Sequence, residues 1–130
     1  TQWGDLDYLF IDMPPGTGDA YLTVASEIKP NHVILVTSQS KLAVQDTIKS
    51  KAMFEKLKIS MIGVVDNMSH SIYSNFDEQI FEFPSINLEN EIGLKVLGSI
   101  PRTKDLANFN PNKLSTFFEP LYNELLKVTS

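Results

Sequence analysis

Residues 8–19 of the chain read YLFIDMPPGTGD, and this stretch decides the fold class. Its first four residues are aromatic, aliphatic or β-branched, which favours a short buried strand. The prolines and glycines that follow Asp12 cannot continue a strand. The sequence therefore predicts a buried strand that ends at Asp12, followed by a loop.

The same order of strand, polar turn and helix continues along the chain. Apolar strands that alternate with amphipathic helices predict an α/β fold, a parallel β-sheet with helices on both faces. Residues 68–90 show a weak pattern, and we expect a long excursion there with one short helix near its end. The other expected elements are strands over 8–11, 33–36, 59–65 and 95–100, the last stopping at Pro101, and helices over 20–28, 41–58, 104–109 and 114–128.

Composition limits the classes of function. The chain has 130 residues, of which 42% are hydrophobic and 21% are charged, as in one ordinary globular unit. Its net charge of -5 argues against nucleic acid, because binding to a phosphate backbone needs clustered Lys and Arg. No apolar run approaches the roughly 20 residues of a membrane span, and no secretory signal is visible. We therefore expect a cytoplasmic protein with no nucleic-acid or membrane partner.

The expected strands end in polar residues, and ligands bind at this edge of open parallel sheets. The ends are Asp12 with its loop, residues 37–40 (TSQS), Asp66-Asn67 and residues 101–103 (PRT). A carboxylate after a buried strand can hold a metal-bound water or orient an attacking water, and glycines let backbone N–H groups approach phosphate. The alternative for Asp12 is a side chain that caps the following turn.

Several segments in this order resemble the Mrp group of iron–sulfur cluster carriers, within the MinD/ParA class of P-loop ATPases. They are Trp3, residues 7–19, residues 36–38 (VTS), residues 62–69 (IGVVDNMS) and residues 97–101 (LGSIP). The resemblance implies a MinD-like P-loop NTPase fold, with residues 1–130 as the C-terminal portion of a single domain. It also implies a protein that binds and hydrolyses ATP in iron–sulfur cluster assembly and transfer, a homodimer when complete, with iron–sulfur client proteins.

The resemblance assigns roles to individual residues. Asp12 resembles the acidic residue that acts on Mg²⁺ through water during ATP hydrolysis, and residues 15–18 resemble the switch that senses the γ-phosphate. Asn67 resembles an asparagine at the adenine edge, although it could simply cap its strand. The cofactor-binding residues implied in this way are Pro15, Gly16, Thr17, Gly18, Asn67, Pro101 and Arg102, with Pro101 equally explained as a strand terminator.

Two departures from the family pattern matter. No Gly-Lys-Ser or Gly-Lys-Thr occurs, so the loop that cradles phosphates is missing and ATP turnover by these residues alone is not expected. Mrp proteins commonly carry a Cys-x-x-Cys pair after the segment matched by residues 62–69, whereas this chain has no cysteine and continues with His70. The cluster is therefore implied by the family only. A MinD/ParA-like ATP-dependent switch without a cluster is the alternative.

Two further expectations follow. In the family that the chain resembles, the phosphate-loop strand lies between the strand that ends at Asp12 and the one that ends at Thr37. Without it, the sheet must either leave a gap or close directly. A two-component receiver also has Asp and Thr at strand ends, but it needs a lysine where this chain has Asp66-Asn67.

Overall fold

A computed structural model describes residues 2, 4–13, 18–72, 79–80, 85–109 and 111–129. Two of the expected helices are present, one over residues 19–28 and one at the C-terminal end of the chain. In the first, residues 24–28 form a π-helical turn. In chain order the elements are α1 (Asp19–Thr23), η1 (Val24–Ile28), β1 (Val33–Thr37), α2 (Lys41–Lys56), β2 (Met61–Ile72), β3 (Gln79–Ile80), α3 (Leu88–Ile92), β4 (Val96–Arg102), α4 (Lys104–Ala107) and α5 (Pro111–Thr129).

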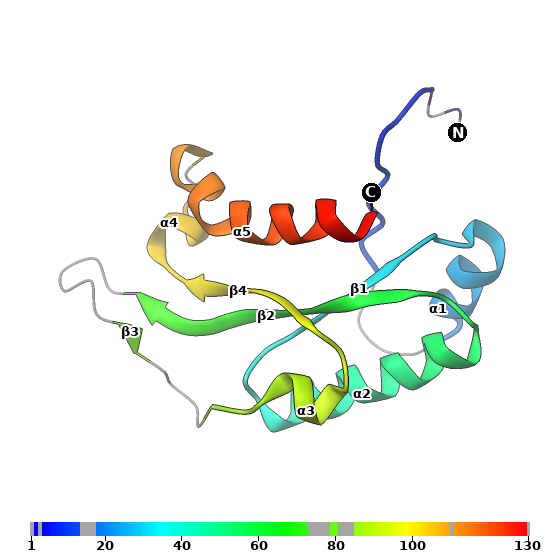
Figure 1. The fold of residues 1–130 in the computed structure, drawn as a ribbon, viewed down its shortest axis with the longest axis horizontal. Coiled ribbons are helices and arrows are strands. Elements are labelled where there is room, and N and C mark those ends of the chain that lie inside the picture. The colour runs from blue at the N-terminus through cyan, green and yellow to red at the C-terminus, as the bar shows by residue number, and fades with distance from the viewer. Residues whose placement is uncertain are drawn as a thin grey trace.

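The sheet is built around β2, which pairs in parallel with β1 on one side and β4 on the other (Figure 1). In this register Asp66 of β2 lies opposite Thr37 of β1 and Ser99 of β4. The short β3 pairs antiparallel with the end of β2. The expected parallel α/β sheet is thus confirmed.

Helices cover both faces of this sheet, α2 and α3 on one side and α5 on the other (Figure 1). Val64 faces α2 and α3, and its neighbour Val65 faces α5, because successive side chains of a strand alternate. The prediction of helices on both faces is confirmed. The core on the first face comprises Leu35, Val44, Phe54, Val64, Leu88 and Ile92, and the core on the second comprises Val65, Leu97 and Ile100, packed against Leu106, Leu121 and Leu125.

The strands predicted to end near Val65 and Ile100, which are β2 and β4, are longer than predicted. β2 continues to Ile72, and β4 runs through Pro101 to Arg102. Their register shifts between Asn67 and Ser71, where Met68 adopts φ 55°. Because the ladder is already irregular at this bulge, the missing N–H of Pro101 is tolerated.

The prediction of a buried strand over residues 8–11 was wrong. None of these residues belongs to a strand, and Tyr8, Phe10 and Ile11 are 50%, 75% and 38% exposed. Within the described part of the chain, no strand pairs with the outer edge of β1. An apolar segment becomes a strand only when a neighbouring strand pairs with its backbone, so these residues are not part of the sheet.

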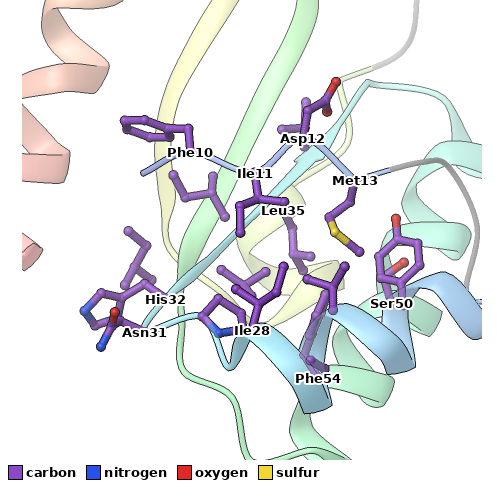
Figure 2. Close-up of a pocket in the computed structure, with 18 of the residues that line it drawn as sticks. Phe10, Ile11, Asp12, Met13, Ile28, Asn31, His32, Leu35, Ser50 and Phe54 are labelled. Atoms are coloured by element: carbon purple, nitrogen blue, oxygen red, sulfur yellow. The ribbon is translucent and has the colours of Figure 1, made fainter. Parts of the chain in front are cut away.

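A hollow of about 1370 Å³ lies between this N-terminal segment and β1 (Figure 2). Ile11 and Met13 point into it, whereas Phe10 and the carboxylate of Asp12 point away. This alternation is that of a strand without a neighbour. Of the two outcomes expected for an incomplete sheet, the structure therefore shows the gap.

Candidate functional site

A buried polar cluster lies where the carboxyl end of β1 meets the middle of β2. Thr37 and Asp66 lie opposite each other and are only 5% exposed each. Gln39 follows β1, and its Nε2 donates a hydrogen bond to Asp66 Oδ2 at 2.6 Å. Among the described residues, Asp66 Oδ1 has no hydrogen-bond partner. A buried carboxylate with one unpaired oxygen is costly, so the bond from Gln39 is an important compensation.

Electrostatics at Asp66 follow from its place in the sheet. Burial raises the pKa of the Asp66 carboxyl, while the Gln39 amide and nearby His70 act in the opposite direction. His70 itself contacts Ser69, whose Oγ lies 2.8 Å from His70 Nδ1. The Ser69 hydroxyl is also 3.4 Å from the Ile100 carbonyl oxygen. The bulge of β2 is thereby tied to β4.

Asn67 stands at the start of this bulge, half-buried, with Ile100 opposite it in β4. Its Oδ1 accepts a hydrogen bond from the Met68 N–H at 3.1 Å, which orients the side chain, and its Nδ2 is the group that can donate to a ligand. Pro101 follows Ile100 and is buried, whereas Arg102 is exposed. The structure thus brings Asn67, Pro101 and Arg102 together on adjacent strands.

Asp12 is exposed and lies outside the sheet. Burial raises the pKa of the Tyr21 hydroxyl in α1, and the negative charge of Asp12 nearby raises it further. Gly18 leads into α1, where its carbonyl oxygen accepts from the Tyr21 N–H at 3.0 Å. The other residues expected in the phosphate-sensing loop, Pro15, Gly16 and Thr17, lie outside the described residues.

The two groups of candidate residues lie on opposite sides of β1. Asp12 lines the hollow at the outer edge of β1, whereas Asn67 belongs to β2 on the inner side. The structure therefore does not join them into one site by direct contact. Any ligand that reaches both must cross the carboxyl end of β1.

A metal held entirely by protein side chains does not fit these residues. In the part of the chain that the structure describes, no three His, Cys, Asp or Glu residues gather into a possible metal site. Mg²⁺ in nucleotide sites usually keeps waters and binds one or two carboxylates together with the phosphates. The exposed carboxylate of Asp12 fits that second arrangement.

The parallel sheet is covered on both faces and has polar strand ends, and its similarity to solved structures places the chain in the class of MinD-like P-loop NTPase folds. The cell division ATPase MinD of Pyrococcus furiosus superimposes with a TM-score of 0.71 over 94% of this chain and 52% of its own, at 22% identity, which shows the fold alone. A nucleotide-binding protein from Archaeoglobus fulgidus, solved with ADP, superimposes with a TM-score of 0.70 at 36% identity, over 82% of this chain and 45% of its own.

Sequence comparison assigns the chain to a family that is more specific than the fold class. The chain belongs to the ParA family of NUBPL iron-transfer P-loop NTPases, whose model matches residues 1–125. A relative from Pseudomonas fragi named iron–sulfur cluster carrier protein is 42% identical over all of this chain and 48% of its own length. The chain spans about half the length of that relative. The resemblance of the chain to the iron–sulfur cluster carriers of the MinD/ParA class is thus confirmed.

Two further observations complete the comparison with the sequence. No helix among the described residues is long and apolar enough to cross a membrane.

Gln39 was visible as one of several polar residues at a strand end, but nothing in the sequence indicated that Asp66 is its partner. A hydrogen bond across 27 residues of sequence becomes evident only when both strands are placed in register.

Proposed function

We propose that residues 1–130 are the C-terminal portion of a single ATPase domain in a protein that binds and hydrolyses ATP while it carries iron–sulfur clusters. The observation that carries this proposal is the polar carboxyl edge of the sheet, which gathers Gln39, Asp66, Asn67 and Arg102 in a chain of the iron-transfer NTPase family. Such an edge is where parallel α/β sheets bind nucleotides.

In this proposal the base of the nucleotide lies against the bulge of β2. The Nδ2 of Asn67 donates to a ring nitrogen of adenine, while its Oδ1 keeps the hydrogen bond from the Met68 N–H. On the neighbouring strand Arg102 is exposed, so its guanidinium plane can stack on a base, whereas the buried Pro101 fixes the backbone beside it. These contacts select the base but supply little affinity for phosphate.

The phosphates belong near Asp12 and residues 15–18. Bound Mg²⁺ would neutralise charge on the phosphate oxygens during transfer. Asp12 would hold one of the metal's waters, and the backbone N–H groups of Gly16, Thr17 and Gly18 would approach the γ-phosphate, whereas Pro15 has no N–H to donate and would restrict the backbone ahead of them. No Gly-Lys-Ser or Gly-Lys-Thr is present, so the main phosphate contacts come from outside these residues.

The hollow beside β1 supports a second polypeptide segment in the complete sheet. We place the phosphate-loop strand there, between residues 8–11 and β1. Its insertion would pair both edges and bury Ile11 and Met13, which already face the hollow (Figure 2). It would also fix Asp12 at the end of a true strand, beside the carboxyl end of β1.

The iron–sulfur cluster is cargo in this proposal, and the 130 residues offer no thiolate to hold it. Clusters are bound chiefly by cysteine. The ligands would therefore lie outside residues 1–130, in the same polypeptide or in an assembly such as a homodimer, and client proteins would receive the cluster. The lack of cysteine also favours a second candidate, a MinD/ParA-like ATP-dependent switch without a cluster.

Anaerobic purification of the complete protein separates the two candidates. A carrier should copurify with, or be reconstituted to, stoichiometric iron and sulfide, and should pass them to an apo-ferredoxin. ATP hydrolysis without any bound iron after reconstitution would instead support the switch. If the complete protein bound neither ATP nor iron, both candidates would be overturned.

A further inference from the structure

One side chain, Gln39, links three parts of the fold that are far apart in sequence. It lies in the turn between β1 and α2. Its Nε2 donates to Asp66 Oδ2 in β2 at 2.6 Å, and its Oε1 accepts from the backbone N–H of Ile86 at 2.8 Å. These partners are 27 and 47 residues away. We call this pair of hydrogen bonds the Gln39 bridge.

The carboxylate of Asp66 fixes which way the Gln39 amide is turned. If the amide were reversed, its oxygen would face a carboxylate oxygen and its NH₂ would face the Ile86 N–H. Both contacts would then be repulsive, and Asp66, which is 5% exposed, could not turn to water instead. The bridge is therefore a directional connection and not an interchangeable surface contact.

Each end of the bridge is next to a residue with a local structural role. Asn67 follows Asp66 and is the residue that we propose donates to the base. Asn87 follows Ile86 and caps α3, accepting from the Asn90 N–H at 3.0 Å. A displacement of Asp66 by much more than half an ångström would break one of the two bonds of Gln39, because hydrogen bonds lengthen only over a narrow range.

We propose that Gln39 is a positioning residue for the nucleotide site: it holds Asp66, and through it Asn67, in place by anchoring the middle of β2 to Ile86 ahead of α3. The inference rests on the proposed function, since it takes Asn67 as the base contact. Gln39 itself touches no nucleotide. Binding at Asn67 and order at Ile86 are then linked through one side chain.

A rescue experiment in the complete protein tests the bridge itself. Gln39→Glu places a second carboxylate against Asp66 and breaks the bridge, whereas Asp66→Asn keeps an oxygen for Nε2 of Gln39. In the double variant the new amide of residue 66 donates to the new carboxylate at position 39, whose other oxygen accepts from Ile86. Amide exchange at Ile86, measured by NMR, should rise by about 2-fold to 10-fold in Gln39→Glu and return in the double variant.

Controls separate this pattern from a general effect of charge or of unfolding. Gln45→Glu adds the same charge on the exposed side of α2 and should leave exchange at Ile86 unchanged. Gln39→Met removes both hydrogen bonds without adding charge, and should reproduce the loss if Gln39→Glu does not fold. Fast exchange at Ile86 in the double variant, or unchanged exchange in Gln39→Met, would overturn the bridge.

Titration with ADP, by calorimetry, tests the positioning role. Affinity should fall by about 2-fold to 10-fold in Gln39→Glu and Gln39→Met, recover in the double variant, and stay at the wild-type value in Gln45→Glu. Equal affinity in all variants, with wild-type binding intact, would overturn the positioning role alone. No ADP binding by the wild-type protein would overturn the proposed function, and the positioning role with it, while the exchange data would still report on the bridge.

Discussion

Replacement of Gly63 by alanine is the sharpest test of how β2 packs against β4. A Cβ atom at this position would lie 2.6 Å from the Lys95 carbonyl oxygen and 2.6 Å from Leu97 Cγ. Real Cβ contacts are not this short, so the backbone of one strand must move. The Lys95 carbonyl cannot move freely, because it accepts a hydrogen bond from the Val64 N–H at 2.9 Å.

The expected cost follows from those contacts. Inserting one methyl group into a well-packed core costs about 1–3 kcal/mol, and weakening one backbone hydrogen bond adds about 1 kcal/mol. We therefore expect Gly63→Ala to lower the free energy of unfolding by about 2–4 kcal/mol. Urea unfolding of the complete protein, followed by circular dichroism, measures this change.

Gly98→Ala is the matched control on β4. The nearest atom to a Cβ at Gly98 is Leu121 Cβ at 3.5 Å, which is an ordinary van der Waals contact. We expect a change in the free energy of unfolding of less than about 1 kcal/mol. Equal destabilisation by the two substitutions would refute the packing described here between β2 and β4.

Three other predictions concern chemistry. In the complete protein, Asp12→Asn should leave nucleotide affinity near wild type but lower steady-state hydrolysis by about tenfold or more, because an amide brings no negative charge to the metal-bound water; unchanged turnover would return Asp12 to a turn-capping role. The 130-residue chain, reconstituted anaerobically with iron and sulfide, should hold no stable cluster by visible absorbance, and a stoichiometric cluster would mean that His70 and carboxylates ligate iron. Hydrogen bonds and charge from Lys127 and Lys95 lower the pKa of Glu124 to about 2, so its contribution to stability is complete above the ordinary value of 4.5 and is lost as the pH falls towards 2. Urea midpoints of wild type and Glu124→Gln should therefore differ at pH 7 and converge near pH 2, and a constant difference would contradict this ion pairing.

The sequence predicted the elements that build their own core. β1, α2 and β4 appear close to their expected positions because periodic apolar residues such as Leu35, Val44 and Leu97 have partners within the chain. The predicted strand over residues 8–11 has equally favourable residues, but among the described residues no strand occupies the hollow beside it. Local propensity alone does not form a strand when the pairing edge is missing.

The candidate site was predicted only in part. The polar ends of β1, β2 and β4 were visible as sequence, and the register brings Asn67 next to Ile100 and Pro101 as expected of adjacent strand ends. The extension of β2 beyond Asn67 was not predicted, because residues 69–71 (SHS) are polar and residues 68–71 belong to a bulge. The Gln39 bridge depends on contacts between distant segments, which no local pattern encodes.

Calorimetric titration with Mg²⁺-ATP tests the central claim most directly, that these residues supply the base and switch portions of a nucleotide site whose phosphate-binding portion lies elsewhere. The account predicts no saturable binding by the 130-residue chain at sub-millimolar concentrations, and saturable binding by the complete protein. Tight, magnesium-dependent binding by the 130-residue chain alone would contradict the account.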